Sequence, residues 1–224
     1  CSTWSITFGY IPAMVCCHSE SQPSRLTLAN RVFALAVKGC SPQTQELALL
    51  ASLLPFFNVA VLRMIMDVID DDDSRGGYSL AINELQDLGI ITWDSELGWF
   101  RFTDGALRRL LATKFAAENP RTAAMLCDRA LQYFAAEAKR GAFLHFSFVS
   151  MIYHLAANSL VGGNAATALC LDWFQRSLST WHNVAWDAVL EAWQTGGGDW
   201  HVQDELESRL GHENCTLISR AIVA

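Results

Sequence analysis

The fold of this chain is decided by residues 41–118, which contain the stretches SPQTQELALLASLLP (41–55), LAINELQDLGII (80–91) and WFRFTDGALRRLL (99–111). The first two stretches place apolar residues three and four positions apart, the spacing of one helical face. The third begins with alternating aromatic residues and then returns to the helical spacing. The segment therefore predicts helices, a short β-hairpin and a further helix.

Capping residues bound the expected helices. Ser41 is an N-cap with Pro42 at the first helical position, and Pro55 ends this first helix. Asn58 and Ser79 are the expected caps of the second and third helices. The expected buried faces are Leu47, Leu50, Ala51 and Leu54 in the first helix, Leu62, Ile65, Met66 and Ile69 in the second, and Ala81, Ile82, Leu85 and Leu88 in the third.

The period changes after Gly89, the expected end of the third helix. Residues 90–93 and 99–103 are rich in β-branched and aromatic side chains, and residues 94–98 form the turn between them. Asp104 then caps a fourth helix. The fourth helix has Leu107, Leu110, Leu111 and Phe115 on one side and Arg108 and Arg109 on the other. Three helices, a two-stranded wing and a fourth helix in this order predict a winged helix.

Helices are expected on both sides of this unit. A lead-in helix over 26–38, with Leu28, Val32, Leu35 and Ala36 on its apolar face, ends at Gly39. Beyond Pro120 the local signals are helical, and the helix over 143–158 is apolar on several faces, as for a central helix. Further helices are expected at 164–179 and 184–193. We expect an antiparallel helical array of tetratricopeptide-like or solenoid character, without a clear repeat period.

The expected fold class is therefore mainly α, in four segments. Residues 1–25 are a lead-in segment to which the patterns assign no structure, and residues 26–118 are the winged-helix domain. Residues 119–195 form the helical array. Residues 196–224 are expected to be a flexible tail with one weak helix around positions 204–210.

Composition bounds the class of protein. The hydrophobic fraction of 51% over 224 residues is ample for a core, and the apolar runs are shorter than the roughly 18 residues of a membrane span. Seven cysteines without a repeated spacing favour free thiols and a reducing, cytoplasmic setting. The net charge of −7, with no Lys or Arg in the third helix, argues against binding to DNA phosphates.

No catalytic pattern accompanies the fold. The lysines, at positions 38, 114 and 139, lie outside any phosphate-binding loop, and no Gly-x-Ser-x-Gly motif occurs. The six histidines lack paired metal spacing, and the run 16–18 (Cys-Cys-His) lacks a second pair of ligands. His145 and His154 fall in the buried helix, where we expect satisfied core or interface groups. The acidic run 70–73 predicts a solvated loop. We therefore expect no catalytic residues, no bound metal and no cofactor held by this segment itself.

The quoted stretches resemble the winged-helix domain of signal-transduction ATPases with numerous domains, the group that includes NB-ARC and NACHT proteins. In that family the domain follows an ATPase core and precedes a helical sensor or repeat array. The resemblance covers about residues 26–158. It implies a non-catalytic regulatory part of a nucleotide-dependent switch, with ATP or ADP bound by an upstream domain and with protein partners.

The resemblance also singles out Thr103. In the family, the second wing strand ends in a Met-His-Asp or similar signature whose His contacts the β-phosphate of ADP. Here Phe102, Thr103 and Asp104 occupy that place, so the Asp matches and Thr103 replaces the His. A hydroxyl can donate a hydrogen bond to phosphate, which makes Thr103 the candidate nucleotide contact. Alternatively, Phe100 and Phe102 are only core strand residues and Asp104 is only a helix cap.

Two other functions stay open. One is a transcriptional regulator whose winged helix binds DNA, although the third helix presents Asn83, Glu84, Gln86 and Asp87 and the wing carries further acidic residues. The other is a scaffold that uses the winged helix only for protein contacts.

Overall fold

The computed structural model describes residues 24–66, 77–95, 98–140, 147, 149–154, 168, 171–172, 186–196 and 200–223. The described part is mainly helical with a small two-stranded antiparallel sheet. Its elements are α1 (Arg25–Ala36), α2 (Pro42–Ala51), α3 (Val59–Met66), α4 (Gly77–Asp87), β1 (Ile91–Asp94), β2 (Trp99–Phe102), α5 (Gly105–Glu118), α6 (Pro120–Arg140), α9 (Trp186–Gln194), α10 (Trp200–Leu210) and α11 (His212–Val223). Residues 149–154, called the central segment below, are also helical.

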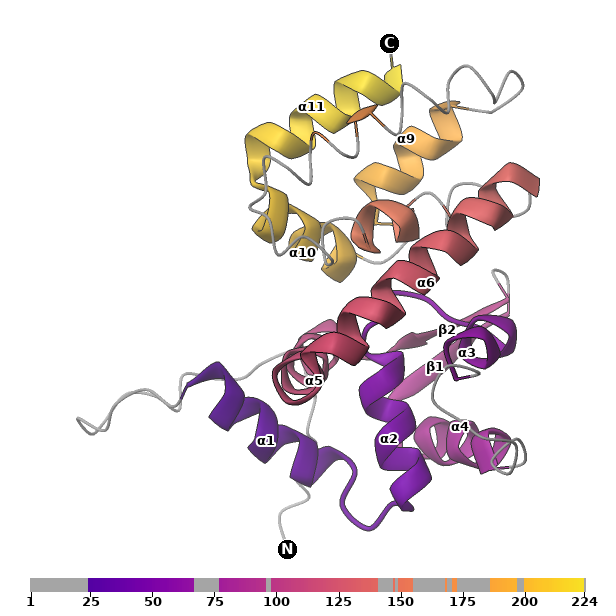
Figure 1. The fold of residues 1–224 in the computed structure, drawn as a ribbon, viewed down its shortest axis with the longest axis vertical. Helices are drawn as coiled ribbons and strands as arrows, with labels where there is room; N and C mark the ends of the chain where they lie inside the picture. Colours follow the sequence, from indigo (N-terminus) through magenta and orange to yellow (C-terminus); the bar gives the residue numbers. More distant parts are fainter. Residues whose placement is uncertain are drawn as a thin grey trace, which may run out of the picture.

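The elements form two groups joined by α6 (Figure 1). The first group contains α2, α3, α4, the hairpin and α5, with α1 packed against α5. The second contains α9, α10 and α11, and α6 runs obliquely from one group to the other. The order of elements in the first group is the one predicted from the sequence.

Helix α2 matches its prediction closely. The Ser41 hydroxyl accepts a hydrogen bond from the backbone N–H of Thr44 at 3.1 Å, and Pro42 is the first helical residue. This bond satisfies one of the amide groups that the first turn leaves unpaired. All four residues of the expected buried face are at most 2% exposed, namely Leu47, Leu50, Ala51 and Leu54.

Helices α3 and α4 match their predictions in part. The Asn58 side chain accepts a hydrogen bond from Val61 N at 2.9 Å, so Asn58 caps α3 as predicted. Ser79 does not cap α4, because the helix already begins at Gly77. Leu88 is 49% exposed rather than buried, since it follows the last residue of α4 and the chain turns away at Gly89 with φ of +67°. The remaining expected core residues of α4 are buried, namely Ala81, Ile82 and Leu85.

The hairpin is antiparallel, with Ile91 opposite Phe102 and Asp94 opposite Trp99. Gly98 adopts a φ of +70° in the turn, which favours glycine because it has no Cβ. A feature without a sequence signal is the bridge between Phe57 and Phe100, whose backbones exchange hydrogen bonds of 3.0 and 2.7 Å. This bridge ties the hairpin to the connection between α2 and α3.

The buried face of α1 differs from the expected one. Leu28 is 38% exposed and Leu35 is 74% exposed, whereas Ala29 and Val37 are buried. Helix α1 packs on α5 through the side that carries Ala29 and Val37, together with the half-buried Phe33. The apolar pattern of α1 fits two adjacent faces, so periodicity alone did not distinguish them.

The expected tail over 196–224 is right in one part, because the weak helix expected around 204–210 lies within α10, and wrong in another, because α11 follows it instead of a flexible end. Gly211, with φ of +84°, separates the two helices. Helix α11 packs on α9 and buries Cys215, Ile218 and Ile222. These three residues are spaced by three and four positions among polar residues, a weak pattern that the sequence reading did not register as a helix.

Several expectations concern residues outside the described ones. They include residues 1–23 of the lead-in segment expected over 1–25, the run 16–18, the acidic run 70–73, His145 and most of the helix expected at 164–179. The central segment, which is described, is buried throughout as expected. Among the helices of the described residues, none is both long and apolar enough to cross a membrane.

We predict that Leu47→Ala lowers the free energy of unfolding by about 2–5 kcal/mol, because Leu47 is fully buried and truncation leaves a cavity. Leu35→Ala, at a side chain that is 74% exposed, is the matched control and changes the free energy by less than about 0.5 kcal/mol. Urea unfolding followed by tryptophan fluorescence measures both. Equal losses in the two variants would contradict the core that the structure shows.

Candidate functional site

A buried ionic network joins the two groups of elements. It consists of Arg108 on α5, Tyr153 in the central segment, and Glu205 and Arg209 on α10. The side chain of Arg108 is 1% exposed and that of Glu205 is 5% exposed. We call these four residues the Arg108 network.

Arg108 is the centre of the network. Its Nη2 donates to the Glu205 carboxylate in an ion pair, and its Nη1 donates to the Tyr153 hydroxyl at 2.8 Å. The same Nη1 lies 3.4 Å from the carbonyl oxygen of Ser52, just after α2. One guanidinium group therefore reaches α2, the central segment and α10 from its place on α5.

Glu205 receives donors from three side chains. Besides Arg108, the Tyr153 hydroxyl donates to Glu205 Oε1 at 3.1 Å, and Arg209 donates to the same oxygen from Nη2 at 2.6 Å and from Nε at 3.1 Å. The guanidinium carbons of Arg108 and Arg209 lie 5.1 and 5.4 Å from the centre of the Tyr153 ring. This distance allows cation–π attraction, which is strongest where water is excluded.

The electrostatics keep the network ionised. Burial alone would raise the pKa of the Glu205 carboxyl, but the charges of Arg108 and Arg209 outweigh it and hold that pKa below its usual value. Burial raises the pKa of Tyr153, so its hydroxyl stays neutral and remains a hydrogen-bond donor. The network thus combines two cations, one anion and one neutral donor.

His154 lies directly beside the network and is fully buried. Its ring stacks on Phe134 of α6 with centroids 5.9 Å apart and meets Tyr153 edge to face at 5.3 Å. Burial, aided by the charges of Arg108 and Arg209, lowers the pKa of His154 to about 3. The imidazole is therefore neutral at physiological pH.

The hydrogen bonding of His154 corrects the expectation of a satisfied core group. Neither ring nitrogen has a hydrogen-bond partner within the described part of the chain. The hydroxyls of Ser147 and Ser150, two turns and one turn earlier on the same helical face, are buried and equally without a partner there. Protein interiors usually supply such groups with hydrogen-bond partners or ordered water. Burying Ser147, Ser150 and His154 without them lowers the free energy of unfolding.

Thr103, the candidate nucleotide contact, lies apart from the network. Its side chain is exposed at the end of β2, and its backbone N–H donates to the carbonyl of Ile90 at 3.0 Å. Phe100 and Phe102 are buried, and the Asp104 carboxylate accepts hydrogen bonds from Ala106 N and Leu107 N at 2.6 and 3.2 Å. Phe100 and Phe102 are therefore core residues and Asp104 is a helix cap, whatever role Thr103 has.

The Arg108 network was not predicted from the sequence, because Arg108 was expected on the side of α5 away from the apolar residues. That placement is wrong, because Arg108 is seven residues before Phe115 and shares the buried arc with Leu111 and Ala112. The position of Arg108 among the buried residues of α5 could have indicated a buried ion pair. The pair Glu205 and Arg209, four positions apart, gave a second signal.

Other reactive groups in the described residues offer no competing site. The thiols of Cys40, Cys127 and Cys215 are free and buried, and burial raises the pKa of Cys127 and of Cys215 to about 11. Such thiols react poorly as nucleophiles. Within the described ranges, no three His, Cys, Asp or Glu side chains are placed to hold a metal ion. The Arg108 network is therefore the site on which a functional argument can be built.

We predict that Glu205→Ala lowers the free energy of unfolding by about 3–5 kcal/mol, because it leaves Arg108 buried without its carboxylate. Glu118→Ala is the matched control, since Glu118, which pairs with Lys114, is 44% exposed. Glu118→Ala lowers the free energy of unfolding by at most about 1 kcal/mol. The double variant Arg108→Met/Glu205→Leu recovers most of the loss if the network acts through charge. Equal effects of Glu205→Ala and Glu118→Ala in urea unfolding would refute the network's role.

His154 predicts a pH dependence of stability. Because its pKa is about 3 in the folded chain, the unfolded chain binds one more proton between pH 3 and the ordinary histidine value. Stability therefore decreases as the pH falls from 7 to 5, by at most about 1.4 kcal/mol per pH unit from this residue. We predict that His154→Leu flattens the decrease between pH 7 and 5, a range above the titration of Glu205.

The measurement is urea unfolding at several pH values. His212→Gln, at a side chain that is 83% exposed, controls for the loss of a histidine elsewhere. An unchanged slope in His154→Leu would show that His154 is not held neutral by the fold.

Comparison with known proteins gives no counterpart: no protein-family model, no curated protein and no solved structure matches this chain. The functional argument therefore rests on the residues described above. Arg108 is the most informative of these residues, because its buried guanidinium group contacts three separate parts of the fold.

Proposed function

We propose that this chain is a non-catalytic regulatory and interaction module of a multidomain, nucleotide-dependent switch protein. In this proposal the segment from α2 to α5 is a winged helix and the later helices begin a helical array. The module relays the nucleotide state of an upstream ATPase domain to a downstream sensor. The order of three helices, hairpin and helix supports the winged-helix assignment, as does the Phe57–Phe100 bridge that anchors the wing.

The observation that carries the proposal is the Arg108–Glu205 ion pair. It connects the last helix of the winged-helix unit to α10, 97 positions later in the chain, inside the protein. A buried charge that loses its partner is costly, so α5 and α10 either move together or separate in one step. Elements with two discrete arrangements are the usual basis of switching. The network therefore couples the two groups of elements.

The exposed surface of the winged-helix unit favours protein contacts over DNA. Leu80 on α4 is 72% exposed, Leu88 just after it is 49% exposed, and Trp93 on the wing is 44% exposed. Helix α4 contains no Lys or Arg to neutralise phosphate. Exposed apolar side chains beside acidic ones suit a protein partner such as an adjacent domain.

Thr103 is the proposed point of contact with nucleotide bound by the upstream domain. Its exposed side chain lies at the N-terminal end of α5, where the helix dipole favours an anion. The Asp104 carboxylate already accepts hydrogen bonds from the first amides of α5, so a phosphate would meet the Thr103 hydroxyl rather than free amides. Movement at Thr103 would pass to Arg108, five residues further along α5.

The test uses the polypeptide that includes the upstream ATPase domain. Hydrogen exchange is measured with ADP and with a non-hydrolysable ATP analogue. We predict that the change of nucleotide alters the protection of amides in both α5 and α10. In Arg108→Met/Glu205→Leu the change persists in α5 and is lost in α10, because the two helices are no longer coupled by charge. Glu118→Gln, on the exposed surface of α5, is the matched control.

Three outcomes would refute the proposal. Identical protection with both nucleotides would favour a scaffold that uses the fold only for protein contacts. Duplex DNA binding that falls steeply between 50 and 200 mM salt, a range typical for phosphate contacts, would favour a DNA-binding regulator. A polypeptide without a phosphate-binding loop before this segment would remove the nucleotide altogether.

A further inference from the structure

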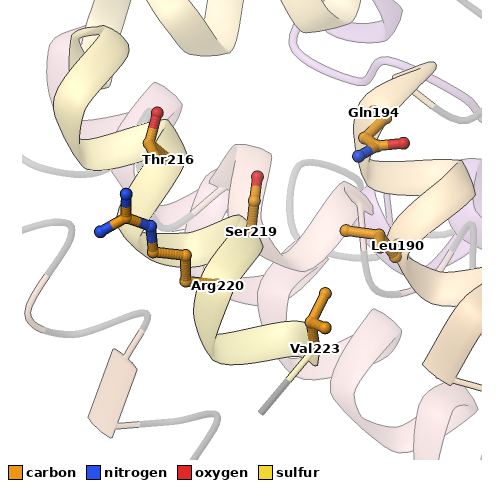
Figure 2. A pocket seen from close by; sticks show the side chains of 6 residues that line it. All are labelled: Leu190, Gln194, Thr216, Ser219, Arg220 and Val223. Carbon is orange, nitrogen blue, oxygen red and sulfur yellow. The ribbon is translucent and has the colours of Figure 1, made fainter.

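A groove runs between α9 and α11 (Figure 2). It is open to solvent and encloses about 390 Å³. Its walls are formed by Leu190, Gln194, Thr216, Ser219, Arg220 and Val223. These residues play no part in the Arg108 network, so the groove is a separate feature of the surface.

The two walls have the spacing of helical ridges. Thr216, Arg220 and Val223 are four and then three positions apart on α11, and Leu190 and Gln194 are four positions apart on α9. Ridges with this spacing flank a groove into which the side-chain ridge of another helix can pack. The shape of the groove therefore suits a helix better than an extended peptide, which would need an unpaired strand edge.

The groove is held in place before any partner binds. Trp193 of α9 is 1% exposed and donates a hydrogen bond from Nε1 to the Ser219 hydroxyl at 2.8 Å. That hydroxyl in turn donates to the Cys215 carbonyl at 2.9 Å. The two walls are thus fixed to each other, so binding would need little rearrangement.

Arg220 adds one positive charge at the edge of the groove, where Figure 2 shows its side chain extending away from α9. Arg220 is exposed and forms no ion pair with any described residue, and no carboxylate lines the described walls. Beside it, Val223 is 68% exposed. A ligand that fits the groove would therefore combine apolar side chains with an anionic group. Because the whole chain carries a net charge of −7, a polyanion would be repelled, which favours a single carboxylate.

We propose that this groove binds one amphipathic helix of a partner protein. Two apolar side chains four positions apart enter the space between Leu190 and Val223, and an Asp or Glu on the same helix pairs with Arg220. The inference rests on the proposed function as an interaction module, for which it supplies a binding surface. It does not depend on nucleotide.

The test is a selection from a displayed library of 16-residue helical peptides with one randomised face, against the full chain. Counter-selection uses Val223→Asp, whose exposed position leaves the fold intact by circular dichroism. We expect the enriched peptides to carry an apolar pair at i and i+4 and one acidic residue. Their affinity decreases at least about tenfold in Val223→Asp, because a carboxylate then faces the apolar pair.

The charge pair is tested by reversal. Arg220→Glu weakens the enriched peptides by at least about threefold, as for a partly exposed pair. Replacing the acidic residue of the peptide by Lys restores binding to Arg220→Glu. Arg31→Glu makes the same change of charge on the exposed surface of α1 and leaves the affinity unchanged.

The proposal fails if no peptide is enriched over the counter-selection, or if the enriched peptides bind wild type and Val223→Asp equally. It also fails if the chain alone forms a dimer in sedimentation velocity that Val223→Asp abolishes, because the occupant would then be a second copy. None of these results affects the nucleotide-dependent protection of α5 and α10. A failure here is therefore distinguishable from a failure of the proposed function.

Discussion

The packing of this protein depends on one buried ion pair, Arg108 with Glu205. A guanidinium group that is 1% exposed must keep its partners, because an unpaired buried charge costs several kcal/mol. Those partners are the Glu205 carboxylate, the Tyr153 hydroxyl and the carbonyl of Ser52. They come from three parts of the chain, so this one requirement sets the position of the central segment and α10 relative to α2 and α5. The second cation, Arg209, keeps Glu205 ionised.

The same requirement connects structure to the proposed relay. Separating Arg108 from Glu205 would leave both charges buried without a partner, which costs several kcal/mol. In the proposed relay, the first group of elements and α10 would therefore move together or separate in one step. The apolar side chains exposed on α4 and the hairpin are the proposed surface for a neighbouring domain, and the groove between α9 and α11 is the proposed surface for a partner helix.

The sequence predicted local structure well where local chemistry determines it. Ser41, Asn58 and Asp104 cap their helices as predicted, because capping bonds span only two or three residues. The sequence did not predict the contacts between residues that are far apart in the chain. The pairing of Arg108 with Glu205 and the bridge between Phe57 and Phe100 each join residues that are far apart in the chain. The candidate site was missed for this reason, since its members are far apart in the chain. Thr103 was proposed from resemblance, and its role stays a prediction.

The length of α6 has a mechanical consequence. Helix α6 has 21 residues, and at 1.5 Å per residue it extends about 31 Å as a stiff rod. It packs beside α5 and α3, and its contact with the first group extends as far as Phe134, whose ring lies 6.0 Å from that of Trp99 on β2. Helix α6 is therefore held by the first group along most of its length, so it moves with that group as one rigid body.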